Sequence, residues 1–200
     1  MNARSDHLEI EHKFVVEADF DLSALRRAAL AISPGPLREN ELRVRDTYFV
    51  LAQKDDLIFR HRHDAERQEL TLKSRGGDTE VRLEVNLRLA QDAGSQLDQV
   101  AAFLRPFHIK WRGTLIKDIA VFYYPDCELV YYTARTDDPA DGDHVLRCVE
   151  LEATHEGDVA AAQKTLSSYE ARLGFADRPR AQASLFELLL QPKMNAALGL

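Results

Sequence analysis

The chain has 200 residues, of which 45% are hydrophobic and 30% are charged. This composition is typical of a globular protein, and the length fits one large domain or two small ones. The formal net charge of −7 excludes a broad basic surface of the kind that holds nucleic acid by its phosphates. No nucleic-acid partner is therefore expected, and any cations that bind phosphate must be local and enclosed.

The cysteine content and the apolar runs indicate in which compartment the protein is expected to work. Cys127 and Cys148 are too few for a disulfide framework, and we expect two buried thiols. No apolar run approaches the length of about 18 residues that a membrane span needs, so no membrane partner is expected. Residues 1–7 are polar and lack the apolar core of a signal peptide. These features predict a cytoplasmic protein.

The first half of the chain is predicted to form mainly strands. A strand over 7–17 precedes a helix over 19–32, for which Asp21 or Ser23 is the expected N-cap. The glycine pair Gly76-Gly77 predicts a hairpin turn between two later strands. The strands predicted in this half after the helix cover 42–50, 57–64, 68–74 and 80–89.

The second half alternates helices with strands. A helix opens at Gly94-Ser95 and ends at Pro106, and a later helix runs from its cap at Asp158 to about Leu173, with Gly174 at its C-terminal end. A last helix covers roughly 183–190. Between the first two helices we expect one or two strands over 109–124, and further strands over 128–135 and 145–154.

Seven short stretches place charged residues at alternate positions with apolar residues between them. Because strand side chains alternate between two faces, the charges of each stretch lie on one face. One such strand would be an ordinary half-exposed strand, whereas six or seven indicate a sheet curled around a charged interior. The stretches are Glu9-Ile10-Glu11-His12-Lys13, Arg60-His61-Arg62, Thr71-Leu72-Lys73, Arg82-Leu83-Glu84, Lys110-Trp111-Arg112, Glu150-Leu151-Glu152 and, more weakly, Arg43-Val44-Arg45.

About eight strands and four helices are predicted, and the short turns between most strands favour antiparallel pairing. No linker or repeat divides the chain, so residues 1–200 are expected to form a single domain. The predicted fold class is α+β. It consists of an eight-stranded antiparallel β tunnel, a closed or nearly closed barrel, with a charged interior and helices packed outside against the apolar faces.

The inward charges sort by sign. Glu9 and Glu11 on the first strand match Glu150 and Glu152 on the last, and the cations lie between. Converging carboxylates repel one another unless positive charge is supplied, and Mg²⁺ or Mn²⁺ suits them because both prefer oxygen ligands. Clustered Arg and Lys side chains in turn need anions such as phosphate. Together these groups indicate a site for the phosphate chain of a triphosphate.

The same residues carry a family resemblance that covers residues 8–190. Glu9-Ile10-Glu11-His12-Lys13 resembles the Glu-x-Glu-x-Lys signature that opens the CYTH domain of the triphosphate tunnel metalloenzymes. Further elements follow in the family's order. They are Asp46-Thr47-Tyr48-Phe49, Arg60-His61-Arg62, Leu70-Thr71-Leu72-Lys73, Arg82-Leu83-Glu84, Lys110-Trp111-Arg112, Glu150-Leu151-Glu152 and the C-terminal Ser184-Leu185-Phe186-Glu187.

The resemblance implies an eight-stranded tunnel, Mg²⁺ or Mn²⁺, and a triphosphate substrate such as inorganic triphosphate, ATP or thiamine triphosphate. It implies that metal is held by Glu9, Glu11, Glu150 and Glu152. Lys13 would be the catalytic residue beside the reacting phosphate, as a charge stabiliser or in positioning the attacking water. The implied phosphate-binding residues are Arg60, Arg62, Lys73, Arg82, Lys110 and Arg112.

Several alternatives stay open at this point. Metal-dependent hydrolysis of a triphosphate leads, ahead of a class IV adenylyl cyclase and of a non-catalytic binder of polyphosphate or nucleotide. Arg43 and Arg45 fit either the basic wall or a solvent-facing tunnel mouth. The strand before the closing Glu-x-Glu carries Tyr131-Tyr132 where family members have an Asp, and Glu128 is the nearest acid on it. Trp111 is expected to face outward, and the protein could be a monomer or a homodimer.

Overall fold

The computed structural model describes residues 8–52, 54–75, 80–142, 144–154 and 158–200. Its strands are β1 (Leu8–Val15), β2 (Arg38–Leu51), β3 (Lys54–His63), β4 (Gln68–Ser74), β5 (Val81–Arg88), β6 (Ile109–Tyr123), β7 (Cys127–Thr136) and β8 (Leu146–Ala153). Its α-helices are α1 (Leu22–Ala31), α2 (Leu97–Leu104), α3 (Val159–Leu173), α4 (Leu185–Leu189) and α5 (Gln191–Leu198), with short 3₁₀ turns at Arg105–Phe107 and Pro139–Asp141.

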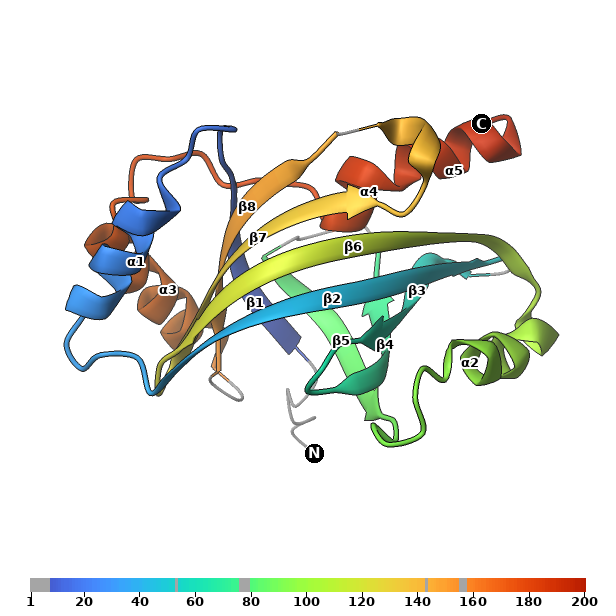
Figure 1. The fold of residues 1–200 in the computed structure, drawn as a ribbon, viewed down its shortest axis with the longest axis horizontal. Helices are drawn as coiled ribbons and strands as arrows, with labels where there is room; N and C mark the ends of the chain where they lie inside the picture. The colour runs from blue at the N-terminus through green and yellow to red at the C-terminus, as the bar shows by residue number, and fades with distance from the viewer. Residues whose placement is uncertain (1–7, 53, 76–79, 143, 155–157) are drawn as a thin grey trace.

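The eight strands close into one antiparallel barrel in the order β1-β5-β4-β3-β2-β6-β7-β8 (Figure 1). Long pairing between β2 and β6 forms its most extended part, running from Arg38 opposite Tyr123 to Leu51 opposite Ile109. The closed antiparallel barrel with external helices confirms the fold class predicted from the alternating charges. None of the described helices has the length and apolar character needed to cross a membrane.

Most predicted elements are confirmed, including two helix caps. Asp158 accepts hydrogen bonds from the first backbone amides of α3, and Gly174 ends that helix at a φ of 78°, which a glycine adopts without strain. The predicted last helix corresponds to α4, and a further helix that was not predicted, α5, starts immediately after it with Pro192 in its first turn. The predicted turn residues Gly76 and Gly77 lie outside the described residues.

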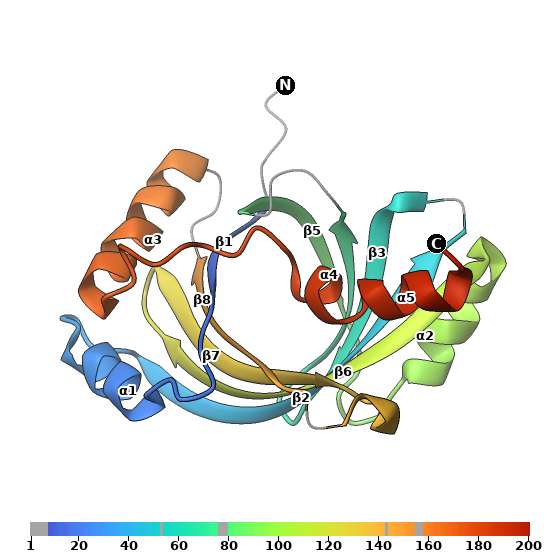
Figure 2. The ribbon, with the colours of Figure 1, turned by 90° about the horizontal axis from the view of Figure 1, so that it is seen from above.

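Two apolar clusters attach helices to the outside of the barrel. α1 and α3 pack on β1, β7 and β8, where Phe14, Leu151 and Leu166 are buried. On the opposite side, α2 places Val100 and Leu104 against β2 and β4. Figure 2 shows these two helical regions on either side of the strands. Cys127 and Cys148 are both free and buried, as expected.

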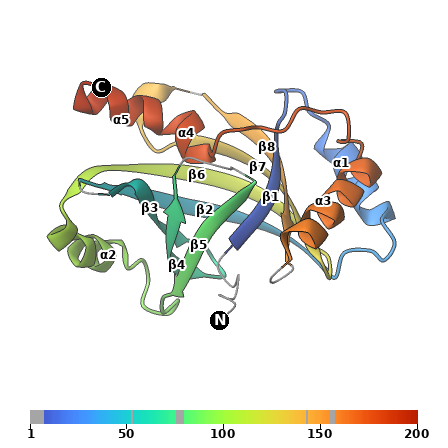
Figure 3. The ribbon, with the colours of Figure 1, turned by 180° about the vertical axis from the view of Figure 1, so that it is seen from behind.

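Helices α4 and α5 cover one end of the barrel (Figures 2 and 3). α4 begins with a capping box in which Ser184 and Glu187 satisfy each other's backbone amides. Phe186 then packs against Tyr48 and Trp111, with ring centroids 5.6 and 6.0 Å apart. This end of the interior is therefore apolar, and the charged cavity lies beneath it.

Gly113 is required by the way Trp111 lies along β6. A Cβ atom at position 113 would come within 2.1 Å of the Trp111 ring, so Gly113→Ala must displace the indole from its contact with Phe186. We expect a loss of about 1–3 kcal/mol in the free energy of unfolding, measured by urea denaturation. Since Trp111 is the chain's single tryptophan, its fluorescence should shift as well. Gly35→Ala is the control, because its nearest contact would be an ordinary 3.8 Å. Equal stability of the two variants would contradict this packing.

Candidate functional site

A cavity of about 460 Å³ runs inside the barrel and is lined by inward side chains of all eight strands. On β1 these are Glu9, Glu11 and Lys13, at alternate positions. The intervening His12 faces outward, as its parity predicts, and its Nδ1 atom lies 2.7 Å from Glu170 on α3. Pairing with β5 and β8 on either side fixes this register of β1, so the signature's three charged residues all point into the cavity.

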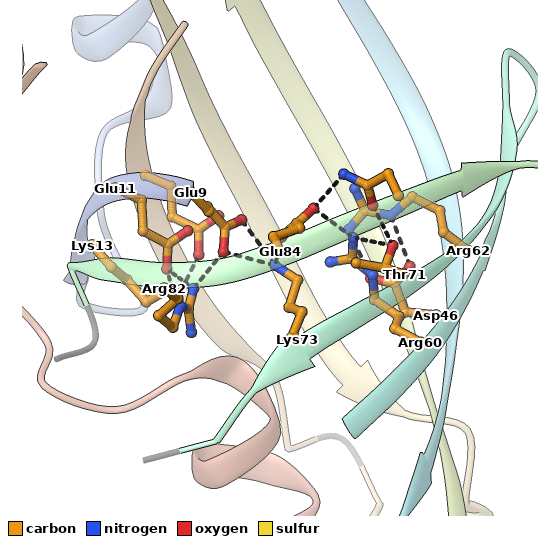
Figure 4. Close-up of polar contacts among 12 residues, drawn as sticks. Glu9, Glu11, Lys13, Asp46, Arg60, Arg62, Thr71, Lys73, Arg82 and Glu84 are labelled. Atoms are coloured by element: carbon orange, nitrogen blue, oxygen red, sulfur yellow. Dashed lines mark hydrogen bonds and ion pairs between the residues drawn. The ribbon is translucent and has the colours of Figure 1, made fainter. Parts of the chain in front are cut away.

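The acidic and basic groups of the cavity interleave instead of forming two separate walls (Figure 4). Lys73 Nζ lies 2.8 Å from both carboxylate oxygens of Glu9, and Arg82 lies 3.0 Å from Glu9 and also contacts Glu11. Lys13 Nζ lies 2.9 Å from Glu11 and 3.1 Å from Glu150. The carboxylates are therefore the counterions of the cations around them.

The pKa values of Glu9 and Glu152 differ because their surroundings differ. Burial would raise the pKa of Glu9, but Lys73 and Arg82 hold it well below its ordinary value. Burial and then neighbouring carboxylates, Glu9 first among them, raise the pKa of Glu152 well above its ordinary value. Among the described residues no cation lies within ion-pair distance of Glu152. Among the described residues, Glu152 thus has no ion-pair partner of the kind that Glu9 and Glu11 have.

A second cluster forms around Asp46, which is fully buried on β2. Arg62 Nε and Nη2 donate to its two oxygens at 2.8 and 3.0 Å, and Lys117 Nζ lies 2.7 Å from Oδ2. Arg60, two positions before Arg62, donates to Thr71 at 3.2 Å. The Nε atoms of Arg60 and Arg82 are buried and have no hydrogen-bond partner among the described residues, so these guanidiniums keep unused donors.

The two cations predicted on β6 do not belong to this site. Lys110 and Arg112 are exposed and lie outside the cavity lining, whereas Lys117 of the same strand is buried within it. The inward positions of β6 are odd-numbered, so Trp111 also faces the barrel interior, opposite to the prediction. A register shift against β2 near Lys110 leaves this parity unchanged along the rest of the strand.

Local sequence contains little that would have identified Lys117. Both faces of β6 near its start carry large side chains, and a charged pair on a solvent face has the same alternation as one in a cavity. The structure also assigns Arg43 and Arg45 to the solvent side, near Asp118 and Asp137 respectively. Other residues that line the cavity, and that were not among the predicted site residues, are Glu69, Glu84, Glu128 and Tyr132. Asp46 is not in the lining, but it contacts two cavity cations, Arg62 and Lys117.

The carboxylates around β1 and β8 have the chemistry of ligands for a hard cation. Glu11 lies directly opposite Glu152, which in turn lies opposite Glu128 on β7, so all three come from adjacent strands. Oxygen donors of this kind suit Mg²⁺ or Mn²⁺. In the part of the chain that the structure describes, no three acidic, His or Cys side chains already converge to hold a metal ion. The donor set therefore has the chemistry of a metal site, while in this structure Glu11 contacts Lys13 and Arg82.

No family model and no curated protein sequence matches this chain. Solved structures share its fold. The PH1012 protein of Pyrococcus horikoshii OT3 is similar over 90% of this chain and 99% of its own, with a TM-score of 0.66 and 17% identity. An adenylate cyclase candidate from Bacillus halodurans is similar over 92% of this chain and 98% of its own, with a TM-score of 0.56 and 18% identity. The RNA triphosphatase domain of a mimivirus capping enzyme is similar over 85% of this chain and 91% of its own, with a TM-score of 0.51 and 9% identity. At these identities the similarity shows the tunnel fold that the resemblance predicted.

Proposed function

We propose that this protein is a metal-dependent hydrolase of triphosphates. The observation that carries the proposal is the enclosed cavity in which buried carboxylates and buried Lys and Arg side chains interleave (Figure 4). A divalent cation would take the carboxylates and a polyphosphate would take the cations, which no single ligand of one charge could do. The similarity in fold to the RNA triphosphatase domain supports the same class of substrate.

The phosphate-binding residues of the proposal come from β3, β4, β5 and β6. Arg60 and Arg82 have unused Nε donors, and Arg62 and Lys73 present cations to the same cavity. Lys117 takes the place on β6 that the sequence prediction gave to Lys110 and Arg112. Arginine matches phosphate geometry by its planar fork, and several such groups together neutralise charge that develops on phosphoryl oxygens.

In this proposal Mg²⁺ or Mn²⁺ would be held by Glu9, Glu11, Glu150 and Glu152, with Glu128 beside them. Such an ion supplies Lewis-acid polarisation of a phosphoryl oxygen. Binding requires Glu9 and Glu11 to leave Lys73 and Arg82, and the phosphate chain then becomes the new partner of those cations. Each ligand thus releases groups that the other one needs, and the two should bind cooperatively.

Lys13 is proposed to act as a fixed positive charge beside the reacting phosphate. Burial alone would lower its pKa, but Glu11 and Glu150 outweigh burial and raise the pKa above its ordinary value. In the metal-free protein the ammonium therefore stays protonated. Lys13→Met is expected to lower kcat by about 10²-fold with a small change in KM. Lys110→Met, on the exposed side of β6, is the matched control. A rise in KM alone would make Lys13 a simple phosphate ligand.

Lys117 predicts a pH dependence of substrate capture. Burial and then Arg62 lower its pKa to about 8, so in the free protein its charge is lost as pH rises through this value. We expect kcat/KM to fall across the same window, because kcat/KM reports ionisations of the free enzyme. Lys117→Arg should abolish this fall, since arginine stays charged. Identical pH profiles for the wild type and Lys117→Arg would show that Lys117 does not bind the substrate.

Product analysis tests the proposal as a whole. Inorganic triphosphate, ATP and thiamine triphosphate are each incubated with the protein and Mg²⁺, Mn²⁺ or EDTA. Metal-dependent release of orthophosphate is the expected result. Cyclic AMP with pyrophosphate from ATP would instead show a cyclase, to which the similarity in fold to the adenylate cyclase candidate also points. A melting temperature that rises with triphosphate, without any product, would show a non-catalytic binder.

A further inference from the structure

One side of the cavity is apolar, and the proposed reaction does not use it. The strands β2, β6 and β7 are neighbours in the barrel (Figure 1). They supply this side of the cavity, and the other five strands supply most of the charges. Its inward residues are Leu42, Ile119, Val121, Tyr123 and Val130. We call these five residues the apolar wall.

The apolar wall is a continuous surface. Leu42 lies directly opposite Ile119, and Val121 lies directly opposite Val130, so the three strands place these side chains next to one another on the inner face. Leu42, Ile119 and Val130 stay half-buried. They therefore still present apolar area to the cavity, although α4 covers the interior beyond Tyr132.

The apolar wall ends in planar groups. The Arg38 guanidinium lies 4.2 Å above the ring of Tyr123, and both residues line the cavity. Planar cations and heterocycles stack on such ring faces. Lys117, two positions before Ile119, marks the other end of the wall, where the phosphate-binding side chains begin.

An inorganic triphosphate gains nothing from an apolar wall. The four aliphatic side chains of the wall offer no hydrogen-bond donor, so they leave part of the anion's charge unsolvated, and desolvation of charge is costly. Burying the wall against an apolar or aromatic group is favourable instead, by the area that both remove from water. A ligand that carries a phosphate chain at one end and a ring at the other satisfies both sides of the cavity.

Building on the proposed function, we infer that the substrate is an organic triphosphate with an aromatic heterocycle, whose ring lies against the apolar wall while its phosphates lie among the cations. The wall then determines specificity: it discriminates against inorganic triphosphate, which has the higher charge and would be preferred by a purely electrostatic tunnel.

Binding constants test this inference without requiring turnover. The probes are methylene-bridged analogues of inorganic triphosphate, ATP, UTP and thiamine triphosphate, which cannot be hydrolysed, titrated calorimetrically in Mg²⁺. At least one ring-bearing analogue should bind about tenfold or more tightly than the inorganic one. Equal or tighter binding of the inorganic analogue than of every ring-bearing analogue would overturn the inference. Absence of turnover with the natural triphosphates would count against the hydrolase proposal only.

Two variants locate the effect on the wall. Leu42→Asn preserves the side chain's size. It should weaken the binding of the preferred ring-bearing analogue about tenfold and leave the binding of the inorganic analogue unchanged. Leu37→Asn, the same change at a residue that is 73% exposed outside the cavity, is the matched control. Ile119→Thr provides a second test at the facing position. Parallel losses for both kinds of analogue in Leu42→Asn and Ile119→Thr would show a general distortion of the tunnel and contradict the assignment.

Discussion

Glu11→Gln is expected to lower kcat for triphosphate hydrolysis by about 10²–10³-fold while the barrel stays folded. Glu11 contacts both Lys13 and Arg82 and lies directly opposite Glu152, so it connects the carboxylates with the cations. Glutamine keeps the size of the side chain and one acceptor oxygen, but it removes the negative charge that a divalent cation needs. Steady-state kinetics over a range of Mg²⁺ concentrations should show that excess metal restores only part of the rate.

The control for Glu11→Gln is Glu41→Gln. Glu41 lies on the solvent face of β2, where its side chain is 70% exposed beside Arg26. This variant should have wild-type turnover and a wild-type melting temperature. Wild-type turnover in Glu11→Gln, with the variant correctly folded, would remove Glu11 from the proposed metal ligands.

Asp46→Asn should produce the largest loss of stability among single polar substitutions in the cavity. The carboxylate is fully buried and holds Arg62 by two hydrogen bonds and Lys117 by an ion pair. Its removal leaves two buried cations without a counterion, which typically costs about 3–5 kcal/mol. For a chain of this size the melting temperature should fall by roughly 6–20 °C.

A bound polyanion should partly compensate for this loss. Because a triphosphate would supply negative charge to the same two cations, it should raise the melting temperature of Asp46→Asn more than that of the wild type. Asp118→Asn is the control, since Asp118 lies on the exposed face of β6 and is 59% exposed. A fall of similar size in Asp118→Asn, or no extra effect of triphosphate in Asp46→Asn, would contradict the account of this cluster.

The strands could be predicted from sequence because their alternation is strong and their turns are short. β2 is longer than predicted. Its first residues, from Arg38 to Glu41, form a strand only because they pair with the end of β6. α5 was missed for a similar reason. Its amphipathic pattern is weak, and Met194 is buried through contacts with the barrel end.

The structure brings the predicted charged residues of five strands into one cavity but not those of β6, for a physical reason. On β1, β3, β4, β5 and β8 the charged residues of each stretch line the cavity and the residues between them face outward, so charge and inward direction coincide. On β6 this relation fails, because Lys110 and Arg112 are on the solvent face. Asp46 and Lys117 meet only through the pairing of β2 with β6, which no local pattern encodes.

In the proposed mechanism, a metal ion and a phosphate chain replace the ion pairs that the cavity's carboxylates and cations make with each other. A crystal structure of the protein with Mn²⁺ and the methylene-bridged analogue of inorganic triphosphate tests it most directly, because anomalous scattering locates the metal. The account predicts Mn²⁺ at about 2.0–2.6 Å from oxygens of Glu11 and Glu150, with Lys73 and Arg82 on phosphate oxygens. Lys73 and Arg82 still paired with Glu9, and no metal at these carboxylates, would contradict it.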